Sequence, residues 1–203
     1  MGLYFEYIYP GLMEKALNRQ SINDLRKTIL SKVKGDVLEI GFGTGLNLAH
    51  YPELVSNITA IDTVVHMSEK VKGRIECSSK TIIFETMSAE NLSFEDNKFD
   101  SVVSTFTFCS ITDTEKAISE IYRVLKPGGR LLFLEHGINP DKKVNRMQNF
   151  INPVFKVISC SLNRDIIQII NMQRFDIIEM NQFYQHDFIK IVDWLYMGVA
   201  IKC

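Results

Sequence analysis

The sequence predicts an α/β domain with a largely parallel sheet and helices on both faces, and three observations carry this prediction. From Asp36 onward, short apolar runs alternate with segments of helical periodicity. Several of these runs are almost continuously apolar, which is typical of parallel strands buried on both faces. The first run leads into a glycine-rich turn, VLEIGFGTG over 37–45. A chain of 203 residues suits one such domain and leaves little for a second.

The elements can be placed in order along the chain. Residues 1–33 are expected to form a helical cap or lid, because apolar residues recur there at helical spacing. The expected parallel strands are 36–41, 57–62, 81–86, 99–105 and 130–136. Between the last two, Thr112 and Glu115 form a capping-box pattern that predicts a helix start. The run Pro127-Gly128-Gly129 is expected to stop that helix.

The end of the chain breaks the alternation. Helical patterns over 146–159 and 164–171 are followed by two expected strands, 175–180 and 196–203, with only a loop between them. This order predicts an antiparallel pair at the edge of the sheet. Residues 137–172 are expected to be an insertion on the substrate side, and its apolar residues indicate either a lipophilic pocket or ordinary helix core. These residues are Phe150, Phe155, Ile158 and Leu162.

Composition excludes several classes of protein. The net charge is −1, so bulk electrostatics give no reason to expect a nucleic-acid partner. No stretch approaches the roughly 18 apolar residues of a membrane helix, and no signal peptide is recognisable. The four cysteines include no CxxC pair, which is typical of reduced thiols. A soluble, cytoplasmic protein is therefore expected, with the basic group Lys142, Lys143 and Arg146 on a solvated loop or, alternatively, on a lipid surface.

The glycine turn raises the question of its ligand. A tight turn of bare backbone lets a ligand approach closely and faces it with amide groups. Asp62 ends the next strand, where an acidic residue typically holds ribose hydroxyls. The spacing is GxGxG rather than the GxGxxG of dinucleotide sites, and Glu39 beside the turn would repel a pyrophosphate. A ribose-bearing ligand with a cationic amino-acid part fits better, and S-adenosyl-L-methionine (SAM) is such a molecule.

At this point the sequence resembles a known family. VLEIGFGTG, AID over 60–62, SAENLSFEDNKFDSVVS over 88–104 and RVLKPGGRLLFLEH over 123–136 look like the class I SAM-dependent methyltransferases, in their quinone-biosynthesis-like branch. The resemblance covers about residues 30–201. STFTFCSITD over 104–113 brings it nearer to two groups, the alkyl-thiol S-methyltransferases of animals and the bacterial phosphatidylethanolamine N-methyltransferases. INPVFKVISCSLNRD over 151–165 is similar to the thiol enzymes.

The resemblance implies a fold and a set of binding roles. The fold is a Rossmann-like sheet of about seven strands, mostly parallel, with the last strand antiparallel. SAM would bind and leave as S-adenosyl-L-homocysteine. The implied cofactor contacts are Gly41, Gly43 and Gly45 under the methionine and ribose, Glu39 at the ammonium, Asp62 at the ribose with Thr63 beside it, Ala89 and Glu90 near the adenine, and Thr105 near the methionine.

Two departures from the family pattern matter. Ser88 stands where the family often has an aspartate that accepts from the adenine amino group, which leaves adenine recognition to backbone or to Glu90. The N-terminal hydrophobic anchor of the thiol enzymes is missing, so a membrane-embedded form is not expected.

His136 is the candidate catalytic residue. It ends an expected central strand, where open α/β sheets place their ligands, and an imidazole suits proton transfer near neutral pH. The competing interpretation is that His136 caps the strand, and a further alternative is that Glu135 orients the histidine. Cys109 is interpreted as a small residue lining the pocket rather than as a nucleophile. No cluster of metal ligands is visible among the scattered histidines His50, His66, His136 and His186.

The predicted function is methyl transfer from SAM to a small acceptor by direct in-line displacement, with a thiol or other soft nucleophile as the first choice. The alternatives are a phospholipid amine head group, a quinone-type ring, or, in a different class, a SAM-binding sensor without turnover. An NAD-dependent oxidoreductase is disfavoured by the GxGxG spacing. The aromatic residues Tyr4, Phe5, Tyr7 and Tyr9 predict either a lid over the sulfonium or a helix packed on the sheet. The sequence does not indicate an oligomeric state.

Overall fold

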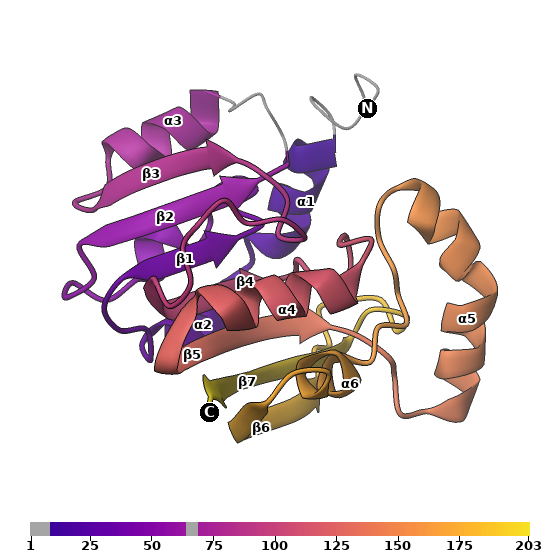
Figure 1. Ribbon diagram of the computed structural model, residues 1–203. Coiled ribbons are helices and arrows are strands. Elements are labelled where there is room, and N and C mark those ends of the chain that lie inside the picture. The colour runs from indigo at the N-terminus through magenta and orange to yellow at the C-terminus, as the bar shows by residue number, and fades with distance from the viewer. Residues whose placement is uncertain (1–8, 64–68) are drawn as a thin grey trace.

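A computed structural model describes residues 9–63 and 69–203 (Figure 1). Two helices, α1 (Tyr9–Leu17) and α2 (Gln20–Leu30), precede the sheet. Of the aromatic cluster at the N-terminus, Tyr4, Phe5 and Tyr7 lie outside the described residues. Whether this N-terminal region acts as a lid stays a prediction.

The sheet has seven strands in the order β3-β2-β1-β4-β5-β7-β6. Their bounds are β1 Val37–Ile40, β2 Asn57–Asp62, β3 Thr81–Thr86, β4 Phe99–Thr105, β5 Leu125–His136, β6 Phe175–Tyr184 and β7 Trp194–Lys202. The first five strands pair in parallel. Strand β7 inserts between β5 and β6 and runs antiparallel to both. This arrangement confirms the predicted largely parallel sheet with an antiparallel last strand.

Helices cover both faces of the sheet, as predicted. On one face, α4 (Thr114–Val124) and α6 (Ile166–Asn171) pack against apolar side chains of β1, β4 and β5 (Figure 1). On the other face, α2 and α3 (Glu69–Glu76) pack against the alternate residues of the same strands and of β2. Because consecutive strand residues point to opposite faces, this two-sided burial explains why the strand sequences are almost continuously apolar.

Several predicted boundaries were wrong. Helix α4 begins at Thr114, and Asp113 is its N-cap, accepting a hydrogen bond from the backbone amide of Lys116 at 3.1 Å. The capping box at Thr112 and Glu115 therefore does not form, since the helix starts one residue later and the Asp113 carboxylate already accepts from its first turn. Strand β5 begins at Leu125, upstream of the Pro127-Gly128-Gly129 run that was expected to end the helix.

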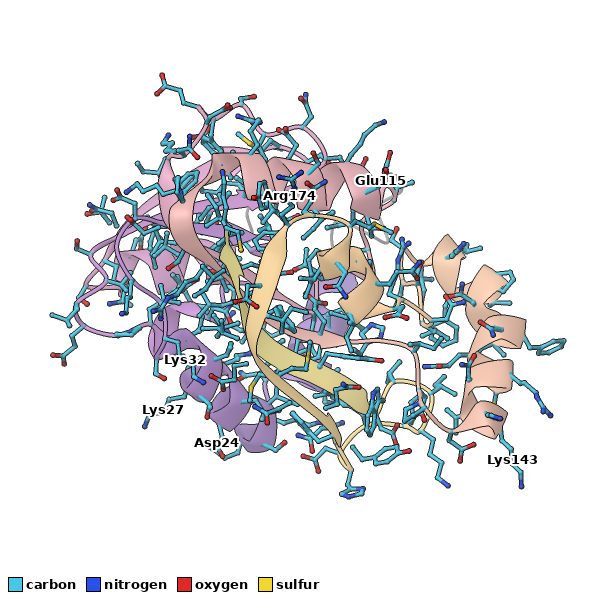
Figure 2. All side chains as sticks on the ribbon, turned by 60° about the horizontal axis from the view of Figure 1, so that its bottom comes forward. Asp24, Lys27, Lys32, Glu115, Lys143 and Arg174 are labelled. Atoms are coloured by element: carbon cyan, nitrogen blue, oxygen red, sulfur yellow. The ribbon has the colours of Figure 1, made fainter. Side chains whose placement is uncertain are left out.

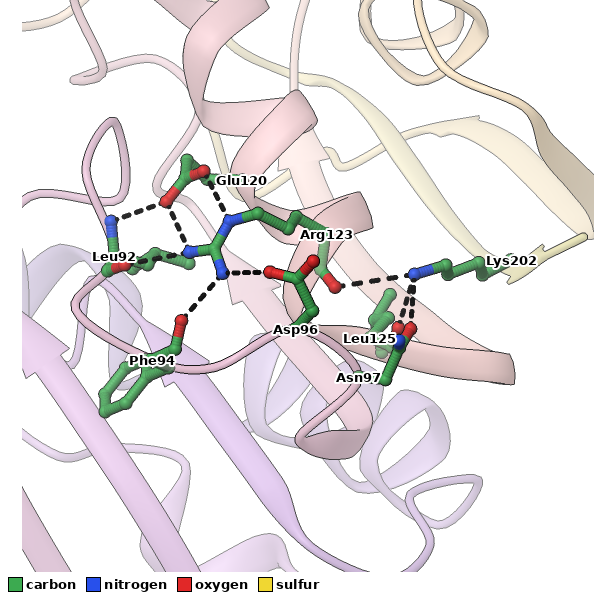
Figure 3. A network of polar contacts seen from close by, with 8 residues as sticks. All are labelled: Leu92, Phe94, Asp96, Asn97, Glu120, Arg123, Leu125 and Lys202. Atoms are coloured by element: carbon green, nitrogen blue, oxygen red, sulfur yellow. Dashed lines mark hydrogen bonds and ion pairs between the residues drawn. The ribbon is translucent and has the colours of Figure 1, made fainter.

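A polar network fixes the segment between β3 and β4, which carries two of the candidate cofactor residues. Arg123 of α4 donates to the carbonyl oxygens of Phe94 at 2.7 Å and Leu92 at 2.8 Å, and it pairs with Asp96 and Glu120 (Figure 3). The partly buried Arg123 thus satisfies backbone groups of an irregular loop that has no strand partner. This anchoring sets where Ala89 and Glu90 emerge from the same segment.

Helix α5 (Lys142–Val157) stands out from the body of the domain (Figures 1 and 2). Its buried face is polar: the amide of Gln148 donates to the carbonyl oxygens of Gly137, Leu162 and Ile191 at 2.9–3.1 Å. Its outer face is apolar, and Phe150 is 85% exposed. The expectation that Phe150 lines a pocket or packs in a core was wrong, because a polar side chain makes the contact with the domain instead. No described helix is both long enough and apolar enough to cross a membrane.

Candidate functional site

Three neighbouring strand ends define the site. Strands β1, β4 and β5 are adjacent and parallel, so the glycine turn after β1, the loop after β4 and His136 at the end of β5 lie at one edge of the sheet. Ligands of open α/β sheets bind at this edge, outside the carboxyl ends of the strands. The sequence-predicted residues of the turn and of β5 are therefore brought to the same side of the molecule.

The glycine turn depends on bare backbone. Gly41 has a φ of +67°, in the left-handed region that side chains rarely adopt. A Cβ atom placed on Gly41 would lie 2.3 Å from the Thr107 hydroxyl oxygen, well inside van der Waals contact. The loop after β4 therefore packs directly on the turn. Gly43 and Gly45 also have positive φ values.

Asp62 contacts this turn, and its predicted role at a ribose stays a prediction. Its Oδ2 accepts a hydrogen bond from the backbone amide of Gly43 at 2.7 Å. Asp62 is half-buried at the end of β2, and Thr63 beside it is exposed. The carboxylate thus stands at the rim of the turn, where it also helps to hold the backbone of Gly43 in place.

Glu39 has a different immediate role from the one implied by the family. It is 2% exposed, its Oε1 accepts from the Asn47 amide at 2.9 Å, and its Oε2 accepts from the Tyr51 hydroxyl at 2.7 Å. Burial raises the pKa of Glu39 to about 7, against the hydrogen bonds of Tyr51 and Asn47 and the charge of Arg26. Glu39 therefore lies beneath the turn and fixes the segment that follows it, and its implied role at an ammonium group stays a prediction.

Asn47 joins this buried group to the end of β4. Its amide nitrogen also contacts the Thr105 hydroxyl at 3.0 Å, and its oxygen accepts from buried Arg26 at 3.0 Å. Thr105 is half-buried beside these groups. Neither Arg26 nor Asn47 was predicted as a site residue, because nothing in the local sequence links an N-terminal helix to this turn.

The candidate adenine residues occupy a turn after β3. Ala89 is buried, and Glu90 accepts from the backbone amides of Thr112 at 2.9 Å and Asp113 at 3.0 Å. The Ser88 hydroxyl accepts from the amide of Glu90 at 3.2 Å. Glu90 therefore ties this turn to the loop that leads into α4, and Ser88 supports the turn itself.

Glu135 holds the loop after β4 rather than the histidine. Its carboxylate accepts from the Ser104 hydroxyl at 2.6 Å and from the backbone amides of Thr107 and Phe108 at 2.9–3.2 Å. The residue is fully buried, and burial raises its pKa to about 7 against these hydrogen bonds. The alternative in which Glu135 orients His136 was wrong, because adjacent residues of a strand point to opposite faces.

His136 instead meets two cysteines. Its Nε2 lies 3.7 Å from the Cys160 sulfur, and the donor atoms of Cys109, His136 and Cys160 all lie within 4.8 Å of one another. The thiol of Cys109 hydrogen-bonds Cys160 and, together with His136, lowers the pKa of Cys160 to about 5 against the effect of burial. The sequence analysis missed this group, since its members come from 109, 136 and 160 with no short motif between them. Cys109 is buried, and whether it lines the site stays a prediction.

The N-terminal helices reach the turn through α3. Glu14 of α1 is buried and pairs with Arg74 of α3 at 2.8 Å. Arg74 in turn donates to the carbonyl oxygen of Thr44 within the glycine turn. This chain of contacts places α1 next to the turn, as a cap over the cofactor side would require.

Comparison with known proteins gives a consistent family. Residues 38–133 match the model described as "Methyltransferase domain". The human thiol S-methyltransferase TMT1B is 29% identical over 194 residues, covering 88% of this chain and 78% of that protein. The methyltransferase OMS1 of Saccharomyces cerevisiae, named as mitochondrial, is 27% identical over 189 residues, with 82% of this chain and 40% of that protein covered. The chain thus spans less than half the length of the yeast relative.

A third relative and two solved structures are also similar to this chain. The phosphatidylethanolamine N-methyltransferase of Cereibacter sphaeroides is 35% identical over 104 residues, which cover 50% of this chain and 51% of that protein. A geranyl diphosphate methyltransferase solved with SAM superposes with a TM-score of 0.73 at 12% identity, covering 96% of this chain and 90% of that chain. The [4+2]-cyclase SpnF superposes with a TM-score of 0.71 at 17% identity, covering 91% and 82%. At these identities the two structures establish a shared fold.

Proposed function

We propose that this chain, which carries a methyltransferase domain over residues 38–133 and resembles thiol S-methyltransferases along most of its length, is a SAM-dependent enzyme that methylates a small thiol. One observation carries the cofactor side: the Asp62 carboxylate meets a turn in which Gly41 has no room for a Cβ atom. Bare backbone together with an acidic residue at the end of the next strand suits a ribose-bearing ligand without phosphates.

In this proposal the cofactor lies along the ends of β1, β2 and β4. Asp62 binds the ribose hydroxyls, the turn around Ala89 and Glu90 borders the adenine, and the methionine part lies toward Thr105. The acceptor approaches from the side of His136 and the two cysteines, and its sulfur displaces S-adenosylhomocysteine in line. The protein then contributes mainly orientation and exclusion of water.

The thiol is favoured over other acceptors by the relatives and by the site. The human relative, which aligns over 88% of the chain, is named as a thiol S-methyltransferase. A thiol is also partly ionised near neutral pH, so it needs only modest help from His136. The second candidate is an amine of a phospholipid head group, favoured by the lipid-methylating relative and by the apolar outer face of α5.

Calorimetry with SAM, and with NAD as the control, tests the cofactor first. We expect micromolar binding of SAM and no binding of NAD. Transfer of a labelled methyl group is then measured to a small alkyl thiol and to phosphatidylethanolamine vesicles. Labelling of the thiol supports the first proposal, and labelling of the lipid alone supports the second. SAM binding with no transfer to any acceptor would point to a sensor, and binding of NAD alone would overturn the proposal.

A further inference from the structure

Three segments far apart in the sequence converge on one small group of soft donor atoms. Cys109 lies in the loop after β4, His136 ends β5, and Cys160 follows α5. The backbone amide of Ser161 donates to the carbonyl oxygen of Cys109 at 2.8 Å, which holds the first and last of these segments together. The two thiols and the imidazole are therefore positioned by the fold and not by a local turn.

The spacing of these donors matches a tetrahedral metal ion. With a Zn–S bond of about 2.3 Å and a Zn–N bond of about 2.0–2.1 Å, tetrahedral angles place sulfur and nitrogen about 3.6 Å apart. The observed distance between the Cys160 sulfur and His136 Nε2 is 3.7 Å. The donor atoms, Cys109 included, lie within 4.8 Å of one another, so small side-chain movements would bring all three to bonding distance.

The histidine is buried beside the two sulfurs. His136 is 6% exposed, and its Nε2 is the ring nitrogen that faces Cys160. Within the described part of the chain its Nδ1 is buried with no hydrogen-bond partner, whereas a histidine that ligates a metal usually donates from its other ring nitrogen. Support for a cation therefore comes from the spacing of the three donor atoms.

We propose that Cys109, His136 and Cys160 form a three-ligand site for a soft divalent cation, Zn²⁺ above all. Two thiolates and one imidazole are ligands that this ion prefers, and three protein ligands leave a fourth position for a substrate. Cys160 is only half-buried, whereas Cys109 and His136 are buried. This site replaces the expectation of an enzyme without metal ligands.

The role of the fourth position on the cation rests on the proposed thiol methylation. In that reaction the fourth position would hold the acceptor sulfur. The acceptor thiol binds as a thiolate, and its proton passes to water. A sulfur lone pair then forms the new bond to the methyl carbon while the bond from that carbon to the SAM sulfonium breaks, and its electron pair leaves with neutral S-adenosylhomocysteine. The cation lowers the pKa of the thiol and undergoes no redox change.

Metal analysis of the purified full chain tests the site without reference to activity. We expect about one equivalent of Zn²⁺ after dialysis, and thiolate-to-metal charge-transfer absorption after replacement by Co²⁺. Cys109→Ser, His136→Ala and Cys160→Ser should each weaken metal binding at least tenfold. Cys77→Ser and Cys203→Ser are the matched controls, because both cysteines are exposed, and they should bind metal like the wild type.

Several outcomes would overturn the site. It fails if neither ion binds stoichiometrically, if the three variants keep the metal, or if Cys109 and Cys160 are isolated as a disulfide that reductant does not convert into a metal-binding form. Calorimetry with SAM keeps the two proposals apart. Thiol methylation at an unchanged rate by metal-free protein would remove the cation site and leave the proposed function standing. Metal binding without SAM binding would leave the cation site standing and overturn the proposed function.

The outer face of α5 supports a second, independent inference. Met147, Phe150, Val154 and Val157 recur at helical spacing and are 42%, 85%, 70% and 75% exposed. The same helix carries the exposed basic residues Lys142, Lys143, Arg146 and Lys156 and no acidic residue. In Figure 2, Lys143 points away from the body of the domain at the N-terminal end of α5.

We infer that α5 docks on a membrane surface that contains anionic lipid. An apolar stripe flanked by basic residues matches both parts of such a surface, the acyl boundary and the charged head groups. The polar anchor of Gln148 and Asn152 is what turns this stripe outward. A second copy of the chain would carry the same positive charge on its own α5, which disfavours pairing of two such faces.

Flotation with vesicles tests this inference. We expect the full chain to float at least tenfold more with vesicles of phosphatidylcholine and phosphatidylglycerol than with phosphatidylcholine alone, and less at high salt. The triple variant Phe150→Ser, Val154→Ser and Val157→Ser should lose this binding while still binding SAM. Leu54→Ser is the matched control, because Leu54 is 97% exposed elsewhere. Absence of flotation, or a dimer in sedimentation that the triple variant abolishes, would overturn the inference.

Discussion

The glycine turn after β1 and the group of Cys109, His136 and Cys160 lie at neighbouring strand ends, yet they keep their shape by different means. The turn has supports close to it in the sequence, from Glu39 beneath it to Asp62 at its rim, and more distant residues such as Arg74 and Thr107 add to them. The cysteine–histidine group is assembled from three distant segments and is held by their packing. The two parts of the site should therefore respond separately to substitution. Changes at the turn should alter SAM binding, and changes at the cysteine–histidine group should alter the rate of methyl transfer.

Substitution of Gly41 should give the largest effect and tests how rigid the turn is. Gly41→Ala combines a positive φ with a Cβ atom 2.3 Å from the Thr107 hydroxyl oxygen. We expect SAM affinity to fall more than 100-fold in calorimetry and the free energy of unfolding to fall by several kcal/mol, since both the strain and the clash are within a packed site. Thr107→Ala should restore part of the loss, because it removes the two nearest atoms.

Gly73→Ala is the control for this comparison. Gly73 lies in α3 with open space around its Cβ position, so alanine there should stabilise the helix by up to about 1 kcal/mol. If Gly41→Ala behaved like Gly73→Ala and left SAM affinity unchanged, the turn would not depend on bare backbone.

The sequence could predict more of the glycine turn than of the cysteine–histidine group. The strand and helix alternation, the turn and Asp62 were predictable, because each depends on residues close together in the sequence. Glu39 was placed at the turn, but its burial against Tyr51 and Asn47 depends on how the chain folds back after the turn. The convergence of Cys109 and Cys160 on His136 requires the path of α5, and the polar buried face of α5 reverses the usual rule that apolar residues face the domain.

The free energy of unfolding should depend on pH through Glu39, which lies beneath the glycine turn. Burial raises the pKa of Glu39 to about 7 in the folded chain from 4.5. Between these values the folded chain holds more protons than the unfolded chain, so the free energy of unfolding falls as pH rises from about 4.5 to about 7. Glu39 can contribute up to about 1.4 kcal/mol per pH unit to this fall. Unfolding in urea at several pH values measures it.

Glu39→Gln isolates this contribution. Glutamine cannot lose a proton, so the variant should show a flatter fall than the wild type, whose remaining slope includes Glu135. Its stability below pH 5 should stay near that of the wild type, because a protonated carboxyl and an amide each offer a donor and an acceptor to Asn47 and Tyr51. Glu69→Gln, with a side chain 89% exposed, is the control and should keep the wild-type slope. Equal slopes for wild type and Glu39→Gln would mean that Glu39 is ionised throughout.

Substitution of His136 tests the reaction side. His136→Ala removes the imidazole beside Cys160 without touching the turn, so turnover should fall about 100-fold while the Kd for SAM changes less than threefold. Steady-state kinetics with a thiol and calorimetry with SAM separate the two effects. His186→Ala, an exposed histidine far along the chain, should keep wild-type turnover. Unchanged kinetics in His136→Ala would reduce His136 to the capping role that the sequence left open.

Asp62 gives the smallest of the four effects and separates its two functions. Asp62→Ala removes both the acceptor for the Gly43 amide and the charged acceptor for the ribose, so SAM affinity should fall by about ten- to thirtyfold, or roughly 1.5–2 kcal/mol. Asp62→Asn keeps an oxygen for the Gly43 amide and loses only the charge. Its free energy of unfolding should therefore match the wild type, while its SAM affinity should fall between those of the wild type and Asp62→Ala. Wild-type affinity in Asp62→Ala would show that the ribose does not depend on this carboxylate.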